Sequence, residues 1–333
     1  MYEKKYHSID IQNKSFLVTG GAGFIGSNLV EYLVKWKAKT ILVLDNLSTG
    51  YLDNISPFLS IESVNFIQGD IRDLKTCQNA CRDIDYVFHQ AALGSVPRSI
   101  KDPITSNDVN ISGFLNMLVA AKDNNVTRFI YAASSSTYGN SKELPKIEDS
   151  IGKPLSPYAI TKYVNELYAD IFNRVYGFQS IGLRYFNVFG PRQDPDGAYA
   201  AVIPKWINLM LYHQEILING DGSTSRDFCY VENAVQANIL AALANSDANN
   251  NIYNIAFGDR TSLNELVDLL RESLKKNDFH YEKESKYQDF REGDVLHSLA
   301  DITKAKFNLG YDPQFDVKSG IQETIKTYIE KRS

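Results

Sequence analysis

The first half of the chain alternates short apolar runs with segments of helical spacing, and this alternation limits the possible folds more than any other feature. Five runs predict strands: 15–20, 40–45, 64–70, 85–92 and 128–134. Each is almost continuously apolar, which is typical of parallel strands covered on both faces. The segments 24–36 and 109–124 carry apolar residues at helical spacing. Repeated βα units predict an α/β fold with a doubly wound parallel sheet.

The second half of the chain is organised differently. A long helix is predicted over 156–177 and a sixth strand over 178–190, running into a loop. Beyond about residue 190 the pattern loosens, with Pro191, Pro195 and Pro204 and several Gly-rich turns. We therefore expect residues 1–190 to form one domain and residues 191–333 mainly a smaller C-terminal substrate-binding lobe, with chain crossings between the two.

Composition narrows the class of protein. A chain of 333 residues allows one large or two closely joined domains. The net charge of −5 gives no electrostatic case for binding nucleic acid or an anionic membrane. No apolar run approaches the ~18 residues of a membrane span, and the polar first 14 residues are unlike a signal peptide. The three cysteines (Cys77, Cys81 and Cys229) suit a reducing compartment, and no histidine cluster accompanies them. We expect a cytoplasmic protein without a metal site.

The first predicted strand runs directly into the sequence GGAGFIG, in which Gly20, Gly23 and Gly26 are spaced three apart. Glycines at this spacing let the backbone turn tightly and approach a pyrophosphate at the N-terminus of the next helix. A glycine trio alone is a weak signal. Here it lies between a predicted strand and a predicted helix, which is the context that a dinucleotide site requires. The arrangement predicts a Rossmann-type fold.

The second predicted strand ends in Asp45, 19 residues beyond the glycine motif. An acid at this point accepts hydrogen bonds from an adenosine ribose and repels a 2′-phosphate, although it could also cap the next helix. No Lys or Arg occurs between Lys39 and Arg72 to pair with a 2′-phosphate, so the sequence favours NAD over NADP. Asp70 and Ile71 are placed to flank the adenine ring, and Asp70 could equally be a turn residue.

Tyr158 and Lys162 lie four residues apart on one face of the predicted long helix. Free tyrosine, with a pKa of ~10, is a poor base at neutral pH. A neighbouring ammonium and a positive nicotinamide ring would both lower that pKa. Such pairs are common on ordinary helices, but the fifth strand ends in SSSTYG (134–139), at the sheet edge where ligands bind. A serine there can share a hydrogen bond with a substrate hydroxyl that Tyr158 deprotonates.

With these motifs, the chain resembles an extended short-chain dehydrogenase/reductase, specifically a UDP-hexose 4-epimerase of the subgroup acting on UDP-N-acetylglucosamine and UDP-N-acetylgalactosamine. The motifs GGAGFIG, DNLSTG, GDIRD, SSSTYG, YAITK, RYFNVFGPRQ and REGD occur in family order and cover about residues 15–310. The resemblance implies that tightly held NAD⁺ accepts hydride from C4 of a UDP-sugar while Tyr158 removes the 4-hydroxyl proton. The 4-keto sugar then turns about its diphosphate and takes the hydride back on its other face.

The resemblance also implies individual site residues. The expected catalytic residues are Tyr158, Lys162 and Ser134. The expected cofactor-binding residues are Gly20, Gly23, Phe24, Ile25, Asp45, Asn46, Ser48, Thr49, Gly50, Asp70, Ile71, Gln90, Ala91, Ala92, Asn110, Tyr158, Lys162 and Tyr185. The expected substrate-binding residues are Gly94, Ser95, Ser134, Ser135, Ser136, Asn187, Gln193, Ala201, Val202, Arg226, Arg291, Asp294 and Ser298. Arg226 and Arg291 match the arginines that grip the UDP phosphates, where charge-assisted hydrogen bonds are strong. Asn187 matches a diphosphate contact and Asp294 a uridine-ribose contact.

Two features bear on the sugar. The sequence GSVPRS (94–99) resembles the subgroup that prefers N-acetylated UDP-hexosamines. Ser298 stands where epimerases restricted to non-acetylated sugars tend to have a bulky side chain, so it leaves room for a 2-acetamido group. Gly94, Ala201 and Gln193 would line the same pocket. We therefore favour UDP-N-acetylglucosamine and UDP-N-acetylgalactosamine as substrates. UDP-glucose with UDP-galactose, and the UDP-hexosaminuronic acids, remain open alternatives.

The main alternative reaction is that of a nucleotide-sugar 4,6-dehydratase or decarboxylase. Dehydratases need a carboxylate for the elimination, which an Asp–Glu or similar pair supplies directly after the catalytic Ser or Thr. Ser135 and Ser136 occupy these positions, and neither hydroxyl can serve as that acid. A non-catalytic NAD-sensing protein would be expected to lack the Tyr/Lys pair or the serine.

The helices 112–124 and 159–177 resemble those of a four-helix dimer interface, so we expect a homodimer.

Overall fold

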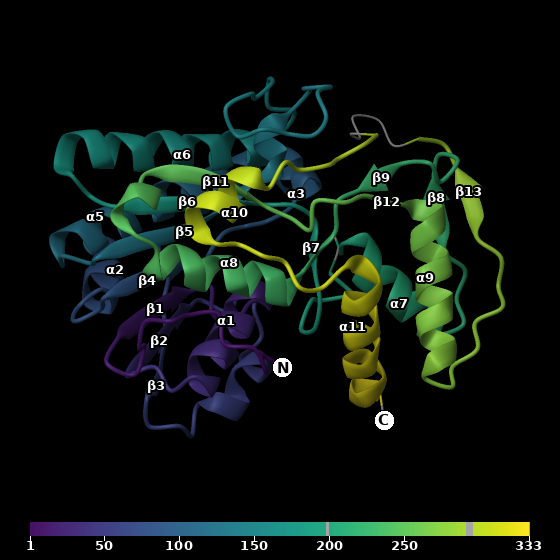
Figure 1. The fold of residues 1–333 in the computed structure, drawn as a ribbon, viewed down its shortest axis with the longest axis horizontal. Coiled ribbons are helices and arrows are strands. Elements are labelled where there is room, and N and C mark those ends of the chain that lie inside the picture. Colours follow the sequence, from purple (N-terminus) through teal and green to yellow (C-terminus); the bar gives the residue numbers. More distant parts are fainter. Residues whose placement is uncertain (198–199, 291–295, 333) are drawn as a thin grey trace.

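The computed structural model describes residues 1–197, 200–290 and 296–332 and is built around a seven-stranded sheet (Figure 1). The strand order is β11-β6-β5-β4-β1-β2-β3, and every neighbouring pair is parallel. The strands are β1 (Ser15–Thr19), β2 (Thr40–Asp45), β3 (Val64–Gln68), β4 (Tyr86–His89), β5 (Arg128–Ser134), β6 (Ser180–Tyr185) and β11 (Asn251–Ile255). The predicted doubly wound α/β fold is confirmed.

Each face of the sheet carries its own hydrophobic core. α1 (Phe24–Lys35) and α8 (Val231–Leu243) contribute to the core on one face. α2 (Leu74–Ala80), α5 (Phe114–Asp123) and α6 (Pro157–Tyr176) contribute to the core on the other. Within β1, Phe16 and Val18 point into the first core and Leu17 into the second. Because side chains alternate between two buried faces, every position of the strand is buried and its central residues are all apolar, which explains the apolar runs in the sequence.

The edge strand β11 is the one strand of the large sheet that the sequence pattern does not predict. It pairs in parallel with β6, with Ile255 opposite Tyr185. Its sequence, NIYNI, contains two asparagines, which are depleted in strands, and these weaken the pattern. The pairing means that segments on both sides of residue 190 build the sheet.

A third hydrophobic core lies in the smaller lobe, beside the sheet (Figure 1). It is formed largely by α7 (Val202–Leu211), α9 (Leu263–Lys276) and α11 (Val317–Arg332), with β8 (Leu217–Asn219) paired to β13 (Lys286–Gln288). The shorter elements are α3 (Val96–Lys101), α4 (Pro103–Asn107), a π-helical turn (Asp108–Gly113), β7 (Val188–Phe189), β9 (Ser225–Arg226), β10 (Cys229–Tyr230), β12 (Thr261–Ser262) and α10 (Thr303–Leu309). Within the described part of the chain, no helix has the length and apolar character that crossing a membrane requires.

Candidate active site

In the turn between β1 and α1, two of the glycines, Gly20 and Gly26, leave no room for a side chain. Gly20 has a φ of +67°, a conformation that L side chains rarely adopt. A Cβ added at Gly26 would lie 2.2 Å from the carbonyl oxygen of Gly20. Gly23 is the N-cap of α1, and no side chain caps this helix end. Its backbone N–H groups and the helix dipole therefore suit a phosphate, as the sequence predicts.

A groove of about 500 Å³ runs along the carboxyl edge of the sheet above this turn. Most of the expected cofactor-binding residues line it: Gly20, Gly23, Phe24, Ile25, Asp45, Asn46, Ser48, Thr49, Gly50, Ile71, Gln90, Ala91, Ala92, Tyr158, Lys162 and Tyr185. They come from loops that follow different strands, so the fold and not sequence proximity brings them together. The glycine cradle and the length of this lining fit a dinucleotide.

At one end of the groove, Asp45 is held in place by backbone donors. Its Oδ2 accepts a hydrogen bond from the Ala22 N–H at 3.0 Å and its Oδ1 one from the Leu47 N–H at 2.8 Å. Burial raises the pKa of the carboxyl, and the two backbone donors oppose that shift. The carboxylate lines the groove, and its role in accepting ribose hydroxyls stays a prediction.

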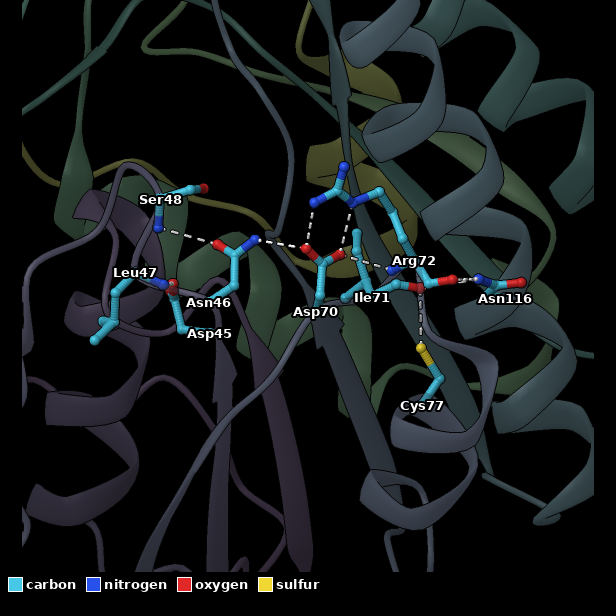
Figure 2. Close-up of polar contacts among 9 residues, drawn as sticks. All are labelled: Asp45, Asn46, Leu47, Ser48, Asp70, Ile71, Arg72, Cys77 and Asn116. Carbon is cyan, nitrogen blue, oxygen red and sulfur yellow. Dashed lines mark hydrogen bonds and ion pairs between the residues drawn. The ribbon is translucent and has the colours of Figure 1, made fainter.

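Asp70 does not line the groove but binds the arginine that follows it (Figure 2). Arg72 donates from Nε and Nη2 to the two carboxylate oxygens at 3.0 and 2.7 Å, and Asn46 donates to the same carboxylate at 2.9 Å. The Arg72 hydrogen bonds hold the pKa of Asp70 well below its usual range. Arg72, the first basic residue after Lys39 in the sequence, is thus neutralised by an acid, which agrees with NAD over NADP.

Asn110 also lies behind the groove wall. Its Oδ1 accepts a hydrogen bond from the Leu93 N–H at 2.7 Å, and its Nδ2 donates to the Leu93 carbonyl and to the Thr161 hydroxyl. Leu93 lines the groove. Asn110 therefore connects the loop after β4 to α6. It does not line the groove itself, but it holds Leu93, which does.

Tyr158, Lys162 and Ser134 meet at the other end of the groove. The Ser156 hydroxyl caps α6 by accepting from the Ala159 N–H at 3.1 Å, which sets Tyr158 in the first turn. Ser134 closes β5, and its hydroxyl accepts hydrogen bonds from the N–H and the hydroxyl of Ser136, at 3.2 and 2.9 Å. The buried Lys162 ammonium donates to the carbonyl of Ala132 at 2.7 Å.

The pKa shifts at this end differ from the expectation. Burial raises the pKa of Tyr158, and the nearby Ser134 hydroxyl offsets only part of that rise. Burial also lowers the pKa of Lys162 to about 8, which Glu166 opposes. The prediction that the Lys162 ammonium brings down the tyrosine pKa is wrong for the protein alone, because desolvation dominates. Of the two positive charges expected to lower the pKa of Tyr158, this leaves the nicotinamide ring of the bound cofactor.

Two further cavities adjoin the groove. One, of about 460 Å³, is lined by Ser134, Ser135, Ser136, Asn187, Arg226 and Ser298 among others; we call it the sugar pocket. The other, of about 1210 Å³, is lined by Ser95, Asn187, Ala201, Val202, Arg226 and Phe290 among others. Gly94 and Gln193 line the first groove instead, together with Asn187 and Ala201. Arg291 and Asp294 lie outside the described residues. Asn187 thus stands where all three spaces meet.

The sequence pattern does not indicate two buried polar residues that support this site. Asp227, next to Arg226, accepts hydrogen bonds from the N–H groups of Phe257, Gly258 and Ala300, and burial raises its pKa to about 7. Asn238 on α8 donates to the Tyr185 hydroxyl at 2.7 Å. Both act on segments far away in the chain, so no local pattern marks them.

Comparison with known proteins agrees with this geometry. The NAD dependent epimerase/dehydratase family matches residues 16–256. The structure of UDP-N-acetylglucosamine 4-epimerase from Methanobrevibacter ruminantium M1, in complex with UDP-N-acetylmuramic acid, is 39% identical, with a TM-score of 0.89 over 96% of this chain and 99% of that one. UDP-glucose 4-epimerase from Thermotoga maritima, solved with UDP-glucose, is 37% identical, with a TM-score of 0.88 over 96% and 100%. UDP-glucose 4-epimerase from Thermus thermophilus, in complex with NAD, is 32% identical, with a TM-score of 0.83 over 95% and 99%.

The matches extend over almost the whole chain, so they include the glycine turn, the groove and the smaller lobe. They agree with NAD as the cofactor. The names of these three structures divide between UDP-glucose and UDP-N-acetylglucosamine, and so leave the sugar open. This protein belongs to the NAD dependent epimerase/dehydratase family and, within it, to the relatives of the UDP-sugar 4-epimerases.

Proposed function

We propose that this protein interconverts UDP-N-acetylglucosamine and UDP-N-acetylgalactosamine by inverting C4 of the sugar. The proposal rests on which residues line the sugar pocket. Ser298 lines the same cavity of about 460 Å³ as Ser134, Ser135 and Ser136. A serine at 298 leaves volume that a large side chain would fill, and a 2-acetamido group needs that volume. The Methanobrevibacter relative, a UDP-N-acetylglucosamine 4-epimerase, supports the same choice.

In this proposal Tyr158 is the acid–base group. Bound NAD⁺ supplies reversible acceptance of the C4 hydride. The Tyr158 oxygen takes the proton of the 4-hydroxyl and later returns it, and Ser134 holds that hydroxyl by a shared hydrogen bond. With a pKa of about 8, Lys162 is mostly an ammonium at pH 7, so it can donate to the nicotinamide ribose. The net redox change is zero.

The division of the chain follows from the same proposal. Residues 1–190 would hold NAD and the Tyr158/Lys162 pair, and residues 191–333 would mainly hold the UDP group. Arg226 donates to the carbonyls of Ser225 and Leu296, and it lines both substrate cavities. A guanidinium fixed between the sugar pocket and the larger cavity suits a diphosphate, which would lie between sugar and uridine.

The competing dehydratase reaction needs a carboxylic acid beside the sugar. Among the described residues that line the sugar pocket, none is Asp or Glu. Ser135 and Ser136 occupy the positions where a dehydratase would place its acid, and neither hydroxyl can replace it. This lack of a proton donor for elimination favours epimerisation.

We also propose a homodimer formed through α5 and α6 of both copies. One face of α6 exposes Ile160, Leu167, Ile171 and Val175, and the exposed fraction reaches 62% at Val175. Their spacing of 7, 4 and 4 residues puts them on one stripe of the helix. An apolar stripe on a long surface helix favours an intermolecular interface.

The test is turnover of UDP-N-acetylglucosamine by purified protein without added cofactor, followed by proton NMR of the anomeric signals. We expect the galacto epimer to form. We also expect Ser298→Tyr to lose ~10-fold or more of this turnover while UDP-glucose turnover persists. Turnover of UDP-glucose alone by the wild type would contradict the proposed substrate. A lasting 4-keto-6-deoxy product would show a dehydratase.

A further inference from the structure

The backbone of Tyr158 is held by a serine from another helix. Tyr158 is the second residue of α6, so its N–H has no acceptor within that helix. The Ser99 hydroxyl, on α3, accepts a hydrogen bond from this N–H at 3.0 Å and donates one to the Val96 carbonyl at 2.8 Å. Ser99 is fully buried and lines none of the three cavities described above. Its hydroxyl therefore joins two helices and does not face a substrate.

The carbonyl of Tyr158 is held as well. It accepts a hydrogen bond from the Thr161 hydroxyl at 2.8 Å, and the Thr161 oxygen accepts one from Asn110 Nδ2 at 3.1 Å. Thr161 and Asn110 are both buried. Each backbone polar atom of Tyr158 thus has a buried side-chain partner. A buried network in which every member is paired makes the first turn of α6 rigid.

The helix that carries Ser99 also forms a wall of the substrate site. Three of its residues line the sugar pocket: Val96, Pro97 and Ile100. The helix follows Ser95, whose φ of +136° is rare for a residue other than glycine and whose hydroxyl accepts from the Arg98 N–H at 3.2 Å. Strain of this kind persists only where the surrounding structure holds it. Ser99 therefore connects a firmly held wall of the sugar pocket to the backbone of Tyr158.

We infer that Ser99 is a positioning residue for the proposed proton transfer, because it holds the Tyr158 backbone at a fixed place relative to the wall of the sugar pocket. The inference rests on the proposed function, since it takes Tyr158 as the acid–base group. Proton transfer requires the phenol oxygen within hydrogen-bond reach of the 4-hydroxyl. A displacement of about 1 Å can lower the rate ~100-fold. The loss of one restraint among several should lower it ~10-fold.

The test compares kcat and KM in the wild type, Ser99→Ala and Ser99→Thr, on whichever UDP-sugar the wild type epimerises. Ser99→Ala removes the acceptor of the Tyr158 N–H, so kcat per bound NAD should fall ~10-fold while KM changes less than about 2-fold. Ser99→Thr keeps the hydroxyl and should keep kcat within about 3-fold. Ser99→Cys fills the same space with a weak acceptor, so it should lower kcat as alanine does and replaces the alanine variant if that one does not fold.

The matched control is Ser106→Ala on α4. Ser106 is 1% exposed, and its hydroxyl donates to the Asp102 carbonyl at 2.8 Å, but it makes no hydrogen bond with Tyr158. This variant should keep kcat within about 2-fold. Equal falls of kcat in Ser99→Ala and Ser106→Ala would show a general loosening of the fold and would overturn the inference. An unchanged kcat in Ser99→Ala would overturn it too.

Hydrogen exchange measured by mass spectrometry separates this inference from the proposed function. The peptide that contains Tyr158 should exchange faster in Ser99→Ala than in the wild type, and at the wild-type rate in Ser106→Ala. Unchanged exchange in Ser99→Ala would mean that Ser99 does not hold this backbone, and the inference fails. A wild type that epimerises no UDP-sugar would contradict the proposed function instead, and the exchange measurement does not depend on that activity.

Discussion

The Tyr158 hydroxyl is the group on which the proposed chemistry depends most. Replacing it with the phenyl ring of Phe keeps the packing but removes the oxygen that acts as the proton acceptor in the proposed reaction. We expect Tyr158→Phe to lower kcat by about 10³-fold, within the usual range for loss of general acid–base catalysis. Epimer formation followed by NMR measures this.

A matched control for that variant is Tyr163→Phe, further along α6. Tyr163 does not line the groove, so its loss should change kcat only a few-fold. Bound NAD, measured after acid release, should be the same in both variants. A Tyr158→Phe enzyme that keeps more than a tenth of wild-type kcat would show that another group moves the proton.

His89 gives a prediction for stability. It is buried against Phe114 and Phe129, its Nδ1 lies 2.9 Å from the Thr19 hydroxyl, and burial lowers its pKa to about 3. In the unfolded chain the pKa is ~6.5, so between pH 6.5 and 3 the unfolded state binds more protons and stability falls as the pH falls. The expected loss from this residue at pH 5 is about 2 kcal/mol.

Urea unfolding at pH 7 and pH 5 measures the effect. The wild type should lose about 2 kcal/mol more than His89→Gln between these two pH values, whatever the stability of the variant at pH 7. His280→Gln changes a histidine outside this core and should keep the wild-type pH slope. Identical slopes for the wild type and His89→Gln would contradict the assignment.

Among the elements, the turn between β1 and α1 gives a prediction about the cofactor. A Cβ at position 26 would meet the Gly20 backbone at 2.2 Å, and neither segment can move without shifting the sheet or the helix. We expect Gly26→Ala to lose most of its bound NAD, measured by absorbance after acid release. Gly177→Ala is the control: its φ of +67° makes it strained, but its Cβ meets open space at the end of α6. Full NAD content in Gly26→Ala would contradict a cofactor cradle at this turn.

The exposed apolar stripe of α6 leads to a prediction about the dimer. Two added charges on this face should prevent its burial, so Leu167→Glu with Ile171→Glu should convert a dimer to a monomer at micromolar concentration. Sedimentation velocity measures the mass. Phe307→Glu removes an apolar side chain that is 84% exposed on α10, and this variant should remain dimeric. A dimer that survives the double substitution would place the interface elsewhere.

For the whole molecule, local signals predict the central sheet and most of the cofactor groove. Six of the seven parallel strands and the glycine turn leave their pattern in short stretches, and the groove forms because parallel strands end at one edge. The edge strand Asn251–Ile255 was missed because its two asparagines hide a strand that only pairing with β6 stabilises. No local pattern marks Asp227, because its hydrogen-bond partners Phe257 and Ala300 lie in distant segments. The upward pKa shift of Tyr158 could not be predicted, since burial depends on the complete fold.

The most direct test of a redox-neutral inversion at C4 uses a substrate that carries deuterium at C4. UDP-N-acetylglucosamine deuterated at C4 is incubated with the purified protein in ordinary water, and the product is analysed by NMR and mass spectrometry. If hydride leaves C4 and returns to it within one closed site, the deuterium stays at C4 of the UDP-N-acetylgalactosamine formed. Deuterium lost to water would contradict hydride return, and deuterium at C6 of a 4-keto-6-deoxy product would show elimination in place of epimerisation.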